Sequence, residues 1–177
     1  SQSFMFDNAY VTQPVCTPAR ASIMTGLYPQ TTGLVKNGIA LGPHTKTIAE
    51  MVSEDYIRAH FGKWHLGHLP AYLPMAHGFD QWLGLPYSND MQQTTGRDAP
   101  FLASIFLEPK SEYWNVPLMR NDEVIQLPAD QTQLTRRYTE EAQAFIEANQ
   151  KQPFFLYVPY TRSKFMHAPP DTSFTAV

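Results

Sequence analysis

The chain has 177 residues, of which 43% are hydrophobic and 16% charged, a composition that excludes a solvated disordered chain and a long charged coiled coil. Thirteen Lys and Arg against sixteen Asp and Glu give a net charge of -3 without a basic run, which argues against nucleic acid as a partner. The longest apolar runs are only a few residues, far short of the ~20 that span a bilayer, so we expect no membrane span. The length suits one domain, or part of one.

The first third of the chain predicts helices and a strand separated by loops. Residues 17–25 predict a helix, because proline is tolerated at its start and a glycine follows its end. Residues 28–43 are rich in Gly, Pro and Thr and predict a loop, whereas 47–52 have the spacing of a short amphipathic helix. Residues 56–61 predict a strand, which leads into a basic and aromatic segment, 62–67, bracketed by two glycines.

The rest of the chain predicts long loops and then a clear helix and strand. Weak periodicity and scattered Pro and Gly over 68–127 favour loops with short pieces of structure. A capping pair, Asp130 with Gln133, precedes a helix that runs to about Gln150. Its apolar stripe consists of Leu134, Tyr138, Ala142, Phe145 and Ile146. Residues 154–158 then predict a strand buried on both faces of a parallel sheet.

This alternation of helices and strands predicts an α/β fold with helices packed on a mostly parallel sheet. Ligands of such sheets gather at the carboxyl ends of the strands. Three polar clusters are expected at such ends: Cys16 with Arg20, Lys63 with His65, and the loop that follows Val158.

Cys16 is the single cysteine, so an internal disulfide is excluded. It stands at the predicted N-terminus of a helix, where backbone amides and the helix dipole favour negative charge, and Arg20 follows one turn later. Taken alone, a lone cysteine is more often a small buried apolar residue. The sequence around it therefore decides between the two interpretations.

Cys16-Thr17-Pro18-Ala19-Arg20, continued by residues 21–29, resembles the first signature of the type I sulfatases. Gly62-Lys63-Trp64-His65-Leu66-Gly67 resembles the second signature of the same family at a suitable separation. Further similarity is found at 78–80, 86–90, 120–122 and 153–157, and it is closest to the arylsulfatase-like members. The resemblance implies an alkaline-phosphatase-like α/β sandwich with a mostly parallel central sheet, incomplete in this chain, and residues 1–177 as part of a sulfatase catalytic domain.

The resemblance also implies that Cys16 is oxidised to formylglycine by a formylglycine-generating enzyme. One hydroxyl of the hydrated aldehyde would attack sulfur, and deprotonation of the other would later expel sulfate. Family precedent places a calcium ion beside this residue, so Cys16 is also predicted to contact the metal. A transition-metal site is disfavoured, because the spacing of His60, His65, His68 and His77 matches no compact ligand set.

Four further residues receive roles from the resemblance. Arg20 would hold the oxidised side chain, and Lys63 would bind a sulfate oxygen. His65 would bond to the formylglycine hydroxyl or assist its deprotonation. Lys63 and His65 are expected to face the same side of an extended segment, and Trp64 to point into the core. Ser88 matches a position that helps to polarise the nucleophile.

The loop after Val158 departs from the family pattern. Relatives carry a histidine about four residues beyond the position of Tyr160, where it protonates the leaving alcohol, and this chain has Lys164 there. We favour His167 as the replacement acid in a shifted loop. The alternative is that Lys164 serves as a weaker acid and a stronger anion anchor.

The predicted function is hydrolysis of a small-molecule or carbohydrate sulfate ester. Two alternatives stay open: a phosphoric monoester or phosphonate hydrolase on the same scaffold, and a noncatalytic relative that binds a sulfated glycan. The family's paired calcium-binding aspartates would precede Ser1 and its later Asp-Asn pair would follow Val177, so this piece is expected to be inactive alone. By analogy, the compartment is periplasmic, secreted or lysosomal.

Overall fold

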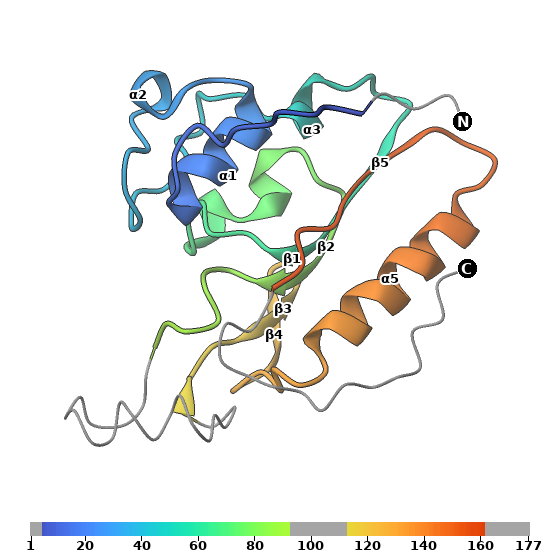
Figure 1. Ribbon diagram of the computed structural model, residues 1–177. Helices are drawn as coiled ribbons and strands as arrows, with labels where there is room; N and C mark the ends of the chain where they lie inside the picture. The colour runs from blue at the N-terminus through green and yellow to red at the C-terminus, as the bar shows by residue number, and fades with distance from the viewer. Residues whose placement is uncertain (1–4, 93–112, 162–177) are drawn as a thin grey trace.

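The computed structural model describes residues 5–92 and 113–161. They form one open five-stranded sheet with helices on both of its faces (Figure 1). The helices are α1 (Cys16–Thr25), α2 (Pro29–Thr32), α3 (Ile48–Met51) and α5 (Leu134–Ala148), with short 3-10 helices η1 (Pro70–Tyr72) and η2 (Pro74–His77). The strands are β1 (Ile57–Lys63), β2 (Gln81–Leu85), β3 (Leu118–Arg120), β4 (Glu123–Gln126) and β5 (Phe154–Tyr157).

The strand order is β4-β3-β2-β1-β5. β1 is parallel to both β2 and β5, and an antiparallel hairpin, β3 and β4, continues the sheet on the far side of β2. The α/β prediction with a parallel centre is therefore confirmed. The hairpin and β2 fall within 68–127, where only short pieces of structure were expected, because strands of three to five residues carry too little periodicity to be read.

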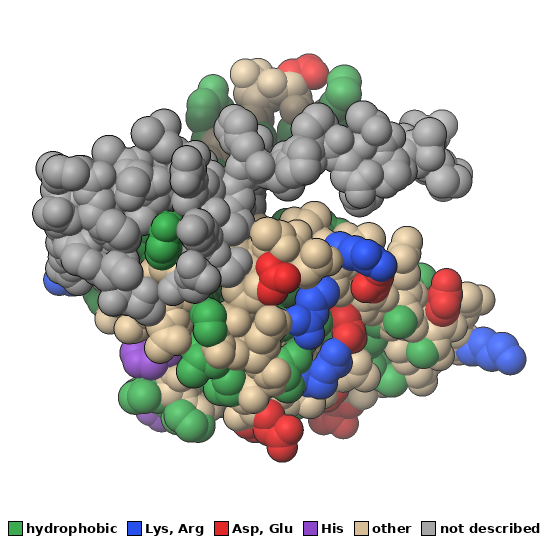
Figure 2. Space-filling view, turned by 90° about the horizontal axis from the view of Figure 1, so that it is seen from below, with side chains coloured by type: hydrophobic (Ala, Val, Ile, Leu, Met, Phe, Trp, Pro, Cys, Tyr) green, Lys and Arg blue, Asp and Glu red, His purple; other side chains and the backbone are tan. Residues whose placement is uncertain are grey.

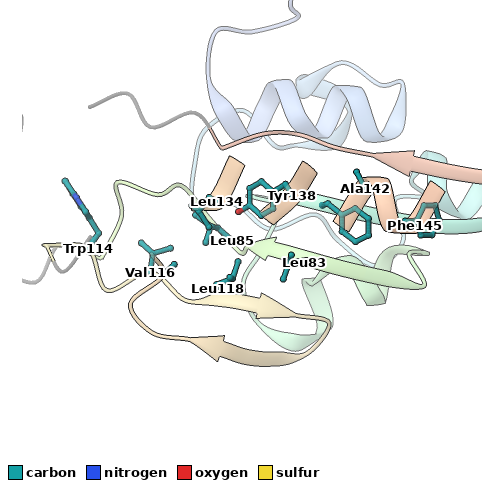
Figure 3. Packing of buried hydrophobic residues seen from close by; sticks show 12 residues of the cluster. Leu83, Leu85, Trp114, Val116, Leu118, Leu134, Tyr138, Ala142 and Phe145 are labelled. Atoms are coloured by element: carbon teal, nitrogen blue, oxygen red, sulfur yellow. The ribbon is translucent and has the colours of Figure 1, made fainter. Parts of the chain in front are cut away.

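Side chains alternate across the central strands and so build two cores. Ala59, Phe61, Leu83 and Leu85 face α5, whose Leu134, Tyr138, Ala142 and Phe145 pack against the sheet (Figure 3). Trp82 and Trp64 lie in the second core with residues of α1 and α3. The prediction that Trp64 packs inward is confirmed: it is buried, and its indole N–H donates to the carbonyl of Tyr72 at 2.7 Å.

α5 matches the predicted stripe except at its edge, where Ile146 is 42% exposed. The predicted capping pair is wrong. Gln133 is the N-cap and makes no side-chain cap bond, whereas the Asp130 carboxylate accepts from the Thr132 amide and hydroxyl. A short Asp turn before the helix thus replaces the capping box, because a nearby hydroxyl competes for the same carboxylate.

Two other expectations differ in detail. β5 pairs with β1 in parallel as expected, but it is the last strand of the described sheet and its residues are half-buried rather than covered on both faces. A four-residue helix, α2, forms within 28–43, where a loop was predicted, because a proline starts it and Gly33 ends it.

On the surface seen from below, acidic and basic side chains are interspersed over the described part (Figure 2). On α5, Arg136 pairs with Glu140.

His60 lies fully buried on β1 among the rings of Trp64, Phe79, Trp82 and Tyr157, at centroid distances of 5.3 to 6.3 Å. Within the described residues neither ring nitrogen has a hydrogen-bond partner of good geometry. Burial, and to a smaller degree the Arg20 guanidinium, lower the pKa of His60 to about 3, although the backbone of His60 and Lys63 opposes this slightly.

We therefore expect acid to destabilise the fold through His60. In the unfolded chain His60 binds a proton below about pH 6.5, whereas in the folded chain it does so only below about pH 3. The free energy of unfolding therefore decreases as the pH falls from 6.5 to 3. The loss from pH 6.5 to 4.5 is roughly 2 to 3 kcal/mol. Urea unfolding at several pH values measures it. His60→Phe should reduce the pH slope by about one proton; equal slopes for wild type and His60→Phe would refute the assignment.

Candidate active site

The candidate nucleophile stands at the first residue of α1. Val15, the residue before the helix, is extended with φ -131° and ψ 141°, so the helix begins at Cys16. The helix is capped from outside its own segment, because the amide of Thr17 donates to the Asn37 side-chain oxygen at 3.0 Å. At its other end Gly26 adopts a left-handed conformation with φ 70°. Cys16 is half-buried and free, which leaves its side chain accessible at a helix N-terminus.

Thr17 connects this helix to the second signature segment. Its side chain is fully buried, and its hydroxyl donates to the carbonyl of His65 at 2.9 Å. His65 has a left-handed backbone with φ 62°, which is uncommon for a residue other than glycine. The expectation of an extended segment is therefore wrong at His65: its left-handed backbone, whose carbonyl accepts from Thr17 and whose amide donates to the Pro86 carbonyl, sets where its imidazole points.

Two cations lie beside Cys16. Lys63 is the last residue of β1, and Arg20 lies one turn into α1 and donates to the Lys63 carbonyl at 2.6 Å. Burial and the Arg20 charge lower the pKa of Lys63, while the charge of Cys16, a side-chain hydrogen bond with it, and Asp90 oppose that shift. Burial also lowers the pKa of Arg20. Two cations held at low solvent exposure favour an anion between them and the helix N-terminus.

His65 has the character of an uncharged base. Burial lowers its pKa to about 4, assisted by the charges of Lys63 and Arg20 and opposed by Asp90. Both imidazole nitrogens are buried and have no hydrogen-bond partner among the described residues. A neutral imidazole without a partner can accept a proton or a hydrogen bond from a group placed beside it.

Two residues of this arrangement were not predicted. Asp90 lies in the turn after β2, and its carboxylate lies close enough to Lys63 and His65 to favour their charged forms. Asn37 lies in the predicted loop and caps α1 across 20 positions. Its only signal in the sequence is its type, since Asn is a preferred capping residue; a partner so distant in the chain is set by tertiary structure.

The other predicted site residues are less informative. Ser88 lies half-buried in the turn after β2, and its carbonyl accepts from the Met91 amide. His167 and Lys164 lie outside the described residues. The structure thus brings together Cys16, Arg20, Lys63 and His65, and the role of each remains a prediction.

A cavity of about 320 Å³ opens beside this cluster. Thr17 and His65 form the side that the cavity shares with the cluster, and Tyr72 and Tyr87 lie among its other walls. The residues described in the structure contain no helix long and apolar enough to cross a membrane.

Known proteins share the sequence pattern and the fold of this chain. The profile of the family described as Sulfatase matches residues 1–174. Arylsulfatase G of Mus musculus is 31% identical over 188 residues, covering 96% of this chain and 35% of the relative. The structure is similar to that of Ps i-CgsB in complex with k-i-k-neocarrahexaose, with a TM-score of 0.61 and 28% identity over 90% of this chain and 36% of the other. It also resembles the PsFucS1 sulfatase from Pseudoalteromonas sp., with a TM-score of 0.64 and 24% identity over 86% of this chain and 35% of the other.

Proposed function

We propose, from the premise that this chain belongs to the sulfatase family, that residues 1–177 are part of the catalytic domain of a sulfuric ester hydrolase. The fold is the alkaline-phosphatase-like α/β fold of the family. The chain spans about a third of the length of the relatives it matches, so activity, substrates and partners are proposed for the whole enzyme. The observation that supports the proposal most is the meeting of Cys16, at a helix N-terminus, with Arg20, Lys63 and neutral His65.

In this proposal Cys16 is first converted to formylglycine by a formylglycine-generating enzyme. One hydroxyl of the hydrate gives its proton to a base as its oxygen bonds to the substrate sulfur, and the bond from sulfur to the ester oxygen breaks. The alcohol leaves with a proton, for which His167 is the proposed donor and Lys164 the alternative. A base then takes the proton of the second hydroxyl, the aldehyde forms again, and sulfate departs with the oxygen that attacked it.

The described side chains supply most of the other functions that this sequence needs. Lys63 and Arg20 offset the negative charge of the bound sulfate. His65 is uncharged at neutral pH, so it can receive the hydroxyl proton in the second step. Asp90 then stabilises the imidazolium, because it already favours the charged form of His65. Ser88 remains a candidate for polarising the nucleophile.

Calcium is expected from the family, and its chemistry is to bind and polarise a sulfate oxygen. The described residues around Cys16 do not fit such a site, because they offer two cations and a single carboxylate, Asp90. Across residues 5–92 and 113–161 no group of three or more His, Cys, Asp or Glu is arranged to hold a metal. Cys16 as a metal contact stays a prediction, and no step of the mechanism is assigned to the ion.

The test is peptide mass spectrometry of the whole enzyme, expressed together with a formylglycine-generating enzyme. We expect the peptide that contains Cys16 to lose one sulfur and two hydrogens and to gain one oxygen. Parallel assays on a sulfate ester and the matching phosphate ester should then show turnover of the sulfate. An unmodified thiol that binds but does not cleave the ester would favour a glycan-binding protein, and preference for phosphate would favour the phosphohydrolase alternative.

A carbohydrate sulfate and an aryl sulfate are both proposed substrates. One relative is called an arylsulfatase, and one similar structure holds a neocarrahexaose. These names describe those proteins. They support, for this chain, a sulfate ester whose alcohol is a ring.

A further inference from the structure

The cavity beside the cluster differs from it in charge. Cys16, Arg20 and Lys63 do not line the cavity, whereas His65 and Thr17 face both. Among the described residues that line it there is no carboxylate, ammonium or guanidinium group. An anion is therefore favoured at the cluster, whereas the described residues that line the cavity offer it no opposite charge.

The cavity walls suit a ring. The imidazole of His68 meets the ring of Tyr87 edge to face, with centroids 6.1 Å apart and an interplanar angle of 78°. Leu69, Tyr72 and Met91 add apolar surface around them. A volume of about 320 Å³ is at the lower end for ligand sites and suits one ring better than an extended chain.

We propose that this cavity holds the alcohol part of the substrate as a single uncharged ring, packed on Tyr87, and that the site prefers esters in which sulfate is the only anionic group. This inference rests on the proposed function, because it takes the cluster at Cys16 as the sulfate end. It adds two specificity determinants: the apolar face of Tyr87, and a lining that contains no cation among the described residues around Leu69. An aromatic ring and a sugar ring share the apolar face that Tyr87 would contact.

The experiment measures binding to the protein with unmodified Cys16, which cannot turn the ester over, and so is independent of maturation. N-acetylglucosamine 6-sulfate and glucosamine 2-N,6-O-disulfate carry a neutral and an anionic group at the same position of one ring. We expect the first to bind at least about 10-fold more tightly, because the second anion would lose water without gaining a cationic partner among the described lining residues. Equal affinities, tighter binding of the disulfate, or no binding of either would overturn the inference.

Leu69→Lys tests the missing cation directly. Leu69 is 55% exposed, so a lysine can be placed there without disturbing the core. It should shift the affinity ratio about 3- to 5-fold toward the disulfate, as expected of a partly exposed ion pair. Leu127→Lys is the matched control, since Leu127 is also 55% exposed and does not line the cavity. An unchanged ratio in Leu69→Lys, or the same shift in both variants, would contradict the proposal.

Tyr87→Ala tests the contact between Tyr87 and the substrate ring, and it distinguishes an aryl substrate from a carbohydrate substrate. It should weaken binding of 4-nitrophenyl sulfate, of the sugar monosulfate, or of both by about 10-fold, while the affinity for inorganic sulfate stays the same. Loss for the nitrophenyl ester alone identifies an aryl substrate, and loss for the sugar identifies a carbohydrate. Tyr28→Ala, at a tyrosine that is 70% exposed, controls for nonspecific effects. No loss for either ester, or an equal loss for inorganic sulfate, would overturn the assignment of Tyr87.

The proposed function and this inference fail separately. A Cys16 that is never converted, or a matured enzyme without sulfatase turnover, contradicts the hydrolase while the binding preference still stands. Normal turnover of mono- and disulfated sugars at equal rates contradicts the cavity assignment and leaves the hydrolase intact.

Discussion

Replacing Cys16 with alanine is expected to lower kcat for 4-nitrophenyl sulfate by about 10⁴-fold or more, as removal of an enzymatic nucleophile does. The reason is that alanine has no thiol through which its Cβ can be oxidised to the aldehyde, so no hydroxyl is present to attack sulfur. The change should leave the fold intact, because α1 is anchored by Thr17, through Asn37 and His65, rather than by the thiol. The measurement is steady-state release of nitrophenol by the matured enzyme.

Cys16→Ser is the informative companion of this variant. A serine that is not oxidised can accept the sulfuryl group but has no second hydroxyl to expel it. We expect one equivalent of nitrophenol per enzyme and then arrest, seen as a burst without a steady state. A urea unfolding midpoint equal to that of wild type controls for misfolding. Steady turnover by Cys16→Ala within about 10-fold of wild type would place the nucleophile elsewhere.

Gly84→Ala is expected to destabilise the fold by about 4 kcal/mol or more, which is a large part of the roughly 5 to 15 kcal/mol of an ordinary domain. Gly84 on β2 pairs in register with Gly62 on β1. A Cβ at Gly84 would lie 1.8 Å from the Gly62 carbonyl oxygen and 2.7 Å from the Trp82 indole nitrogen. The first of these atoms belongs to the backbone of a central strand and cannot rotate away, so β1 and β2 would have to separate.

The measurement is urea unfolding, together with the soluble yield of the variant. Gly42→Ala is the matched control, because nothing lies within 4 Å of a Cβ there and its φ is not positive. Because Lys63 follows Gly62 directly, any Gly84→Ala protein that folds should also bind sulfate more weakly. A variant whose stability lies within about 1 kcal/mol of wild type would show that the two strands do not approach as closely as described.

Local patterns were enough to place the elements that carry most of the site. The helix after Cys16 was predictable from Pro18 at its start and Gly26 at its end, both of which act through backbone geometry alone. The stripe on α5 was predictable because a helix repeats every 3.6 residues over 15 residues. Short strands such as β3, with three residues, give no such repeat, so their pairing depends on neighbours distant in the chain.

The residues of the cluster could also be predicted from the sequence, but the contacts that bring them together could not. Lys63 and His65 were expected to face the same side of an extended segment. Instead His65 has a left-handed backbone conformation, and its carbonyl accepts a hydrogen bond from the Thr17 hydroxyl. Asp90 joins them from the turn after β2, a placement that no spacing in the sequence indicates. The preference of a residue type for caps or turns predicts where that residue stands in the chain, but it does not predict which distant residue it will contact.

Residue types and local patterns were enough to predict the groups of the cluster: a cysteine at a helix start, an arginine one turn later, and a lysine and histidine at the end of a strand. These predictions rest on residues within a few positions of one another in the chain. The charge states of the groups and the shape of the cavity could not be predicted in this way. Burial, and cations brought together from α1 and β1, hold His65 neutral, and solvent exclusion of this kind exists only after distant segments have packed.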